Sequence, residues 1–408
     1  MHHLVESTSN HYILIITDSP PPTHKSKGRF HFEAMWVKRE DCREVIKAAW
    51  DSGALSVTPE GVASNLIRCV DALAIWNQNV VGNISKQIQE KRRALNSLTM
   101  DDQHGSRGAD INHLRKEIND LLDSKETIWR QRNKVHWYKK GDQNTKFFHA
   151  RASERRRKNT ILELWNDNGE WCESKESITA TAISYFENIY STSFPTGIDE
   201  ITNVVPRRVT EEMNTELTQV FTRDEVSKAL QQLHPTKAPN LDGMFAIFYH
   251  KYWDIAGSNI TNMVLNVLNS NLPMTEINKT NISLIPKTNH PTKMTDFCPI
   301  SLCNTTYKFI SKILANRFKT ILPSIISENQ STFTPDCLIT DNVLVAFEFM
   351  HYLNHKNDEK ENYMSIKLVM SKAFDRVEWN FIKGVMVKLG FLNGLILLCI
   401  VSLLCLTQ

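Results

Sequence analysis

A basic segment in the middle of the sequence carries the side chains best suited to bind a polyanion. Between Trp129 and Lys158, eleven Lys and Arg face only two acids, a net charge of +9 in a chain whose formal net charge is +3. A solvated helix face usually alternates the sign of its charges, and this segment barely does. The segment therefore predicts a nucleic-acid-binding surface. Its candidate residues are Arg130, Arg132, Lys134, Lys139, Lys140, Lys146, Arg151, Arg155, Arg156, Arg157 and Lys158.

Aromatic side chains are interleaved with these cations, at Trp137, Tyr138, Phe147, Phe148 and His149. Rings in such a position can stack on unpaired bases. Most of them are nevertheless expected to lie in the core. The run 155–158 also resembles a nuclear import patch, although four basic residues are a short motif.

The cysteines and the apolar runs exclude other classes of site. Eight cysteines occur without a Cys-x-x-Cys pair, so we expect no zinc site and free thiols in a reducing compartment. The beginning of the sequence lacks the pattern of a signal peptide. The apolar run 395–405 is shorter than the ~18–20 residues of a membrane span. We expect an intracellular protein, nuclear or cytoplasmic, without a transmembrane helix.

Helical periodicity dominates the elements that would position these residues. Apolar residues spaced by three and four predict two antiparallel helices over 76–138, joined by a flexible tip at 101–108. The string Thr222-Arg-Asp-Glu225 is a capping box and predicts a helix start. A further helix is expected at 305–322. Short strands are expected at 281–285, 299–302 and 364–369. Many helices with few strands predict an α+β fold.

Five strings occur in an order that resembles one family. They are WYKKGDQNTKFFH at 137–149, LIPK at 284–287, PISL at 299–302, Asn329-Gln330 and SKAFDRVEW at 371–379. Together they resemble the successive blocks of the reverse transcriptase of plant-type LINE (non-LTR) retrotransposons. The similarity extends over nearly the whole chain from about residue 9. It implies a helical N-terminal extension followed by the fingers and a partial palm of a right-hand polymerase.

The resemblance also implies a division of the chain. Residues 1–18 would be the remnant of the last strand of an endonuclease/exonuclease/phosphatase-type domain, in which His11 is expected to be a surface residue. The remaining parts would be a linker with short helices at 19–75, a basic helical N-terminal extension at 76–160, a connecting segment at 161–220, and the fingers with an incomplete palm at 221–408.

The chemistry implied by the family is RNA-directed DNA polymerisation, with RNA template and DNA as partners. In this chemistry carboxylates hold two Mg²⁺ ions that activate the primer hydroxyl and stabilise the leaving group. The first palm motif of the family carries a metal-binding Asp where this sequence has Val369, and the 408 residues contain no Tyr-x-Asp-Asp. Asp375 is expected inside the following helix, with a structural role. We therefore expect no intact catalytic residue and no bound Mg²⁺, as in a truncated and degenerate copy.

Two residues resemble parts of the nucleotide site. Lys287 is similar to a fingers lysine near the incoming triphosphate, and Phe374 is similar to the aromatic that excludes the ribose 2′-hydroxyl, although a core position is as good an interpretation of Phe374. The fingers arginine expected before PISL is Cys298. The Gly-Pro of the family loop is replaced by Asn240-Leu241 within 237–243. These departures remove a bidentate phosphate ligand and two turn residues.

The function predicted from the sequence is thus a LINE-type reverse transcriptase whose activity has been lost. The alternative from another class is a non-enzymatic RNA-binding helical module that keeps only the basic extension. A third interpretation is the unexpressed product of a pseudogene.

Overall fold

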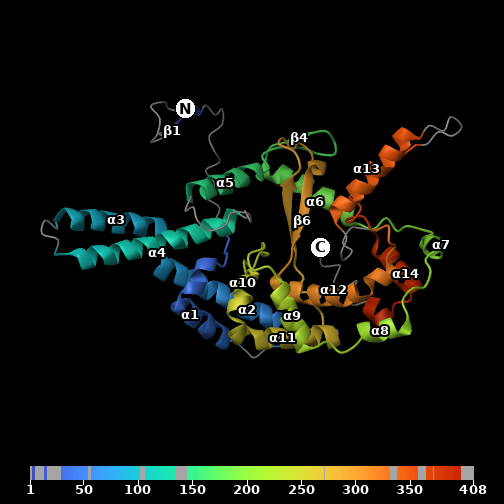
Figure 1. The fold of residues 1–408 in the computed structure, drawn as a ribbon, viewed down its shortest axis with the longest axis horizontal. Coiled ribbons are helices and arrows are strands. Elements are labelled where there is room, and N and C mark those ends of the chain that lie inside the picture. The colour runs from blue at the N-terminus through green and yellow to red at the C-terminus, as the bar shows by residue number, and fades with distance from the viewer. Residues whose placement is uncertain are drawn as a thin grey trace.

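The computed structural model describes residues 2–4, 13–15, 29–53, 57–101, 106–133, 145–270, 272–330, 338–356, 364–370 and 372–396, with side chains described from residue 29 onward except at 133, 145–149 and 339. Helices predominate, and the strands of the described residues form three antiparallel pairs (Figure 1). The expected α+β class is confirmed. His11 and most of the expected endonuclease remnant lie outside the described residues.

The strands pair as β1 (His2–Leu4) with β2 (Ile13–Ile15), β3 (Leu164–Trp165) with β4 (Trp171–Cys172), and β5 (Asn281–Pro286) with β6 (Phe297–Leu302). The helices before residue 160 are η1 (Ala34–Lys38), α1 (Glu40–Asp51), α2 (Pro59–Trp76), η2 (Asn77–Val81), α3 (Ile84–Asp101), α4 (Gly108–Asn133) and α5 (Thr145–Lys158). Those after it are α6 (Lys175–Tyr190), α7 (Ile198–Thr202), α8 (Glu211–Leu217), α9 (Arg223–Gln232), α10 (Ala246–Lys251), α11 (Trp253–Ser270), η3 (Met294–Asp296), α12 (Thr305–Ile325), α13 (Ile339–His355) and α14 (Trp379–Leu389).

The largest core joins the beginning of the chain to its middle. The ring of Phe32 lies 5.3 Å from that of Trp36 and 5.7 Å from that of Phe248 in α10, in edge-to-face geometry. Trp36 in turn contacts Trp76 at 5.7 Å. Buried residues of α1 and α2 belong to the same cluster as those of α9 to α12. The expected linker 19–75 is corrected in this respect, because from residue 29 on it supplies one wall of this core.

Two antiparallel helices, α3 and α4, form an arm beside this core, as expected (Figure 1). Ile88 and Ile118 are buried between them, and Lys91 pairs with Glu117 at 2.9 Å. The C-terminal end of α4 is fixed through Gln131, whose amide donates to the carbonyl of Phe32 at 2.8 Å and accepts from the N–H of Ala34 at 2.8 Å. A buried amide that satisfies two backbone groups fixes the direction in which α4 leaves the core.

The predicted capping box of α9 is confirmed, and it is connected to α12. The Thr222 side chain accepts from the N–H of Glu225, and the Glu225 carboxylate accepts from the N–H of Thr222 at 2.9 Å. The same carboxylate accepts from Arg317 at 2.7 and 2.9 Å. Arg317 also donates to the carbonyls of Leu217, Gln219 and Val220, which lie before α9. One arginine therefore closes the turn between α8 and α9 and fastens it to α12.

The hairpin β5–β6 rises from this body toward the connecting segment (Figure 1). Its register pairs Asn281 with Leu302 and Pro286 with Phe297. Phe297, Met294 and Leu164 of β3 form a small core covered by the α6 face that carries Tyr185. The N–H of Trp165 donates to the carbonyl of Thr292 at 2.8 Å. Residues 161–190 therefore pack on the tip of the β5–β6 hairpin.

The strand expected at 364–369 does not form. Residues 364–370 have no strand partner among the described residues. The apolar side chains of Met364, Ile366, Leu368, Val369 and Met370 are 66–87% exposed. An apolar pattern alone does not form a strand, because the N–H and C=O groups of the segment need a neighbouring strand to pair with. Further on, Leu395 and Ile396 are buried with Val209 and Leu217 of the α8 region.

Among the helices of the described residues, none is both long and apolar enough to cross a bilayer.

Replacing Arg317 by alanine should destabilise the protein by about 3 kcal/mol, because the largely buried Glu225 carboxylate and the backbone carbonyls before α9 would lose their donor. The measurement is urea unfolding at pH 7. Lys279→Ala is the matched control, since its exposed pair with Glu276 should contribute about 0.5 kcal/mol or less. Equal losses in the two variants would contradict the assigned role of Arg317.

Candidate nucleic-acid and nucleotide site

The basic helix α5 exposes the side chains of Arg151 and of Arg155, Arg156, Arg157 and Lys158. Glu154 pairs with Arg151 at 3.4 Å and with Lys158 at 3.2 Å, and its pKa is lowered chiefly by the hydrogen bond from Lys158. No ion pair joins Arg155, Arg156 or Arg157 to an acid within the described residues. Three adjacent arginines thus expose their guanidinium groups on one helix.

On α4 the two candidate arginines differ. Arg130 is exposed, whereas Arg132 pairs with Glu33 at 2.6 Å. Burial raises the pKa of the Glu33 carboxyl, and Arg132 opposes that effect. Half of the Arg132 side chain remains exposed, so this residue both fixes α4 to the core and adds charge to the surface.

The remaining candidates of the basic segment lie outside what the structure describes. Lys134, Lys139 and Lys140 lie outside the described residues, as do Trp137 and Tyr138. Lys146 and the aromatic residues 147–149 belong to α5, but their side chains lie outside it as well. The prediction that they bind nucleic acid stays a prediction.

The palm segment places Val369 on an exposed stretch before a tight turn. Its side chain is 77% exposed. Residues 372–376 form the turn, in which the N–H groups of Asp375 and Arg376 donate to the carbonyl of Lys372 at 3.0 Å. Asp375 thus lies before α14, which begins at Trp379, and the expectation that it lies inside that helix is corrected. Asp375 belongs to a turn and does not start a helix.

Two lysines meet beside this turn. The Lys287 ammonium donates to the carbonyl of Thr295 at 3.0 Å, and the Lys372 ammonium donates to the carbonyl of Phe297 at 3.2 Å. Burial lowers the pKa of Lys372, and the nearby charge of Lys287 lowers it further. Lys372 also has a positive φ of 53°, which is uncommon outside glycine. Sequence reasoning missed Lys372, although it lies within the SKAFDRV string that identified the palm.

Phe374 and Cys298 flank these lysines. Phe374 is 74% exposed, so it does not have the core position considered for it. Cys298, opposite Ile285 in the hairpin, is exposed as well. The hairpin end and the palm turn therefore converge on one place with two ammonium groups, and Cys298 contributes no guanidinium fork to it.

Residues 285–401, which include the strand β6, the two lysines and Val369, match the family described as reverse transcriptase (RNA-dependent DNA polymerase). This segment is therefore similar to reverse transcriptases. The chain is also 24% identical over 397 residues to the "Transposon TX1 uncharacterized 149 kDa protein" of Xenopus laevis. That alignment covers 94% of this chain and 30% of the relative, so the chain spans about a third of the relative's length. The expected similarity to a transposon reverse transcriptase is confirmed, whereas plant type and truncation stay predictions.

Reverse transcriptases use Mg²⁺ and act on RNA and DNA. The residues of this reverse-transcriptase segment do not fit the metal at the palm position, because the isopropyl group of Val369 has no oxygen ligand to offer a hard cation. Within the described residues no group of three or more His, Cys, Asp or Glu gathers elsewhere to hold an ion.

The loop 237–243 is held from several sides. Asn240 donates to the carbonyl of Lys279 and to the side chain of Asn304, the latter at 2.9 Å. Gly243 has a φ of +65°, and a Cβ there would collide with the carbonyl of Phe30. Asp242 accepts from the N–H of Met244 at 3.1 Å, and burial raises the pKa of its carboxyl to about 6. Asn240 thus joins the loop to the backbone before β5 and to the residue that precedes α12.

Asp242→Asn should stabilise the protein at pH 7–8. Because the folded-state pKa of Asp242 is about 6 against 3.8 ordinarily, wild-type stability should fall as the pH rises from about 4 through 6. The amide keeps the acceptor for Met244 and has no charge to desolvate, so the variant should lose this fall. Urea midpoints at pH 4.5, 6 and 7.5 measure it.

Asp254→Asn is the control of opposite sign, since the hydrogen bond from Arg43 lowers the pKa of Asp254. That variant should be slightly less stable than wild type at neutral pH. A loss of stability at pH 7.5 in both variants would contradict the assignment for Asp242.

Proposed function

We propose that the chain contributes the fingers and part of the palm of the RNA-directed DNA polymerase of a plant-type LINE (non-LTR) retrotransposon. We propose further that this chain binds nucleic acid without polymerising DNA. One observation carries the proposal: the reverse-transcriptase match includes position 369, where the metal-binding Asp of the family would lie and this chain has valine. In this proposal residues 76–160 form the basic extension, 161–220 connect it, and 221–408 carry the fingers and palm.

The loss of catalysis follows from what two-metal chemistry needs. Carboxylates must hold two cations about 4 Å apart, and no other side-chain type of this segment replaces them. The exposed valine offers no ligand, and Asp375 lies six residues further along, in the turn before α14. Cys298 removes the bidentate phosphate contact of an arginine. We propose that no Mg²⁺ is held at this position.

Binding to RNA has less exacting needs, and the exposed arginines of α5 meet them. Each phosphate contact requires only a cation that reaches the backbone of the nucleic acid. Arg155, Arg156 and Arg157 are exposed at consecutive positions of the same short helix, and Arg130 and half of Arg132 are exposed on α4, which contacts α5. The same exposure favours the second candidate function, a non-enzymatic RNA-binding module, and a nuclear address for the run 155–158.

The full chain should show no templated primer extension on RNA with Mg²⁺ or Mn²⁺. Val369→Asp alone should not restore activity, because one carboxylate cannot hold two metals. The assay follows deoxynucleotide incorporation against a heat-killed sample, with an active retroviral reverse transcriptase as the positive control. Templated extension by either form of the chain above the heat-killed sample would refute the proposed inactivity.

The full chain should bind single-stranded RNA with little sequence preference and with a steep dependence on salt. Replacing Arg155, Arg156 and Arg157 together by alanine should lower the slope of log K against log salt by about 2, at ~0.7 per lost phosphate contact. Filter binding between about 50 and 300 mM KCl measures both.

The matched control removes the same charge elsewhere, from the exposed Lys228, Lys251 and Lys279. An equal loss of slope in the control would mean that net charge acts instead of the α5 surface. A flat salt response in the wild-type chain would contradict RNA binding altogether.

A further inference from the structure

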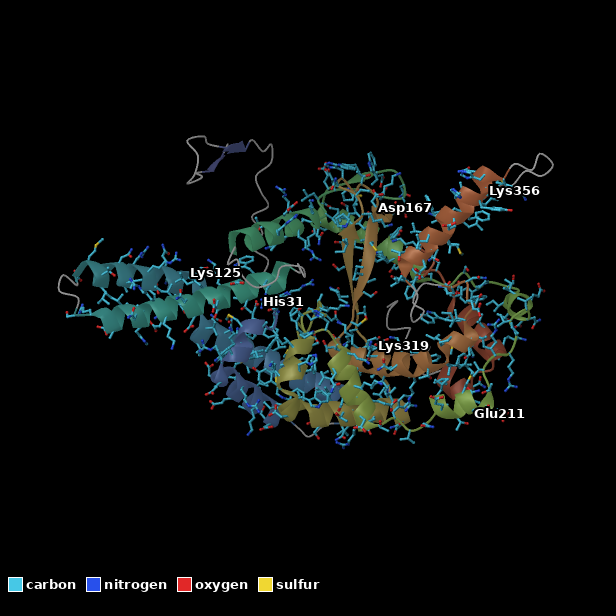
Figure 2. All side chains as sticks on the ribbon, viewed as in Figure 1. His31, Lys125, Asp167, Glu211, Lys319 and Lys356 are labelled. Carbon is cyan, nitrogen blue, oxygen red and sulfur yellow. The ribbon has the colours of Figure 1, made fainter. Side chains whose placement is uncertain are left out.

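A cavity of about 520 Å³ lies between the β3–β4 hairpin, α6 and the residues before β6. Its walls include Trp165, Asp167, Tyr185 and Lys293. Figure 2 places Asp167 at the end of the molecule where these elements meet. Ligand-binding cavities commonly measure about 300–1,000 Å³, so this one has the size for a single nucleotide.

The aromatic wall of the cavity is held rigidly although it is open to solvent. Trp165 is 41% exposed, and its ring lies 4.8 Å from that of Trp171, which is 37% exposed. The backbone of Trp165 is fixed by its hydrogen bond to Thr292, and Leu164 beside it is fully buried. A large ring that is immobilised without being covered loses little entropy when another ring stacks on it.

A polar turn presents the carboxylate of Asp167 beside this wall. The side-chain oxygen of Asn166 accepts from the N–H groups of Asn168 at 3.1 Å and Glu170 at 2.8 Å. Gly169 closes the turn with a φ of +79°. Asp167 lies near enough to Tyr185 to add to the rise in its phenol pKa, which is due mainly to burial and is opposed by Arg376. The cavity thus offers a ring face, the carboxylate of Asp167 and the ammonium of Lys293.

This set of groups matches a guanine nucleotide. The ring face of Trp165 provides stacking for a purine. The adjacent N–H donors on the Watson–Crick edge of guanine match the two oxygens of a carboxylate, whereas adenine presents one donor and one acceptor there. The ammonium of Lys293, which lines the cavity, could pair with a phosphate of the same nucleotide. A second ammonium is near, because Lys287 donates to the carbonyl of Thr295, which also lines the cavity.

The cavity lies close in sequence to the basic helix α5, so an RNA strand bound on α5 could supply the guanine. Only the residues 159–163 separate the end of the basic helix α5 from β3, and such a span reaches at most about 20 Å. A strand whose phosphates contact Arg155 to Lys158 would therefore pass close to Trp165. Figure 1 shows α5 leading toward β4 and α6.

We propose that the cavity walled by Trp165, Asp167 and Tyr185 binds one unpaired guanine base of an RNA strand held on α5. RNA as the source rests on the function proposed above, whereas recognition of guanine rests on the cavity alone. The site shares no lining residue with the palm position of Val369 and does not depend on polymerisation.

Calorimetric titration of the full chain with GMP, AMP, CMP and UMP tests the cavity without RNA. GMP should bind more tightly than AMP, and the pyrimidine nucleotides should bind weakest. Trp165→Ala should weaken GMP binding by about tenfold or more, since stacking contributes ~1–3 kcal/mol per base. Trp165→Phe should restore most of it. Asp167→Asn should bring the affinities for GMP and AMP close together.

Leu162→Ala is the matched control, because this exposed residue of the same segment does not line the cavity and should leave GMP binding unchanged. Thermal melting of each variant checks that it folds. The triple alanine variant of Arg155, Arg156 and Arg157 should lose RNA affinity but keep GMP binding.

The outcomes separate the two proposals. No saturable GMP binding up to ~10 mM, or equal GMP affinity of wild type and Trp165→Ala, overturns the guanine site even if RNA binding on α5 persists. GMP binding without salt-dependent RNA binding leaves the site in place and overturns RNA as its source. Equal affinities for all four nucleotides in the wild type overturn the role assigned to Asp167.

Discussion

The ion pair between Arg317 and Glu225 is the contact on which the arrangement of the reverse-transcriptase segment depends. The Arg317 side chain is 13% exposed and that of Glu225 is 28% exposed. Burial alone would raise the pKa of Glu225, but Arg317 and the N–H of Thr222 outweigh it and the pKa is lowered. The guanidinium also lies 3.5 Å from the ring centre of Phe221. The Arg317 guanidinium is largely removed from water, and such a charge is tolerated only where its N–H donors find acceptors. The acceptors on Glu225 and on the carbonyls before α9 therefore fix how α12 lies against the start of α9.

Helix α12, which carries Arg317, makes further contacts at both of its ends. At its N-terminal end, Asn304 meets Asn240 of the loop 237–243, and Thr305 donates to the carbonyl of Met244 at 2.9 Å. The β6 strand enters directly before it, so the hairpin that carries Lys287 and Cys298 is directed by the same helix. At its other end Ile321 packs with Leu395 and Phe391. One helix, α12, therefore connects the Arg317–Glu225 ion pair to the end of the β5–β6 hairpin.

What the sequence could predict divides according to the range of the interactions. Four adjacent residues determine the start of α9, and the apolar periodicity of each helix determines the α3–α4 pair. Both are therefore predicted correctly from the sequence. The failures concern elements defined by distant partners. Residues 19–75 resemble a linker with short helices, yet Phe32 within them is covered by Phe248 of α10. Residues 364–369 resemble a strand but have no partner strand among the described residues. The proximity of Lys287 and Lys372 is not predicted for the same reason, because the two lysines lie 85 positions apart along the chain.

The same distinction applies to the recognition of bases. Charge is a local property of sequence, so the run of arginines on α5 is visible at once. Exposure of an aromatic ring is a tertiary property, and interleaving with cations does not reveal it. Trp165 and Trp171 flank a turn and resemble ordinary strand residues, yet the packing of Leu164 beneath them leaves both rings facing solvent. Binding to phosphates tolerates the loss of a single cation, whereas metal catalysis does not tolerate the loss of its carboxylate. The charge on α5 and the residue at position 369 are therefore independent features, and the arginines of α5 stay exposed although Val369 offers no metal ligand.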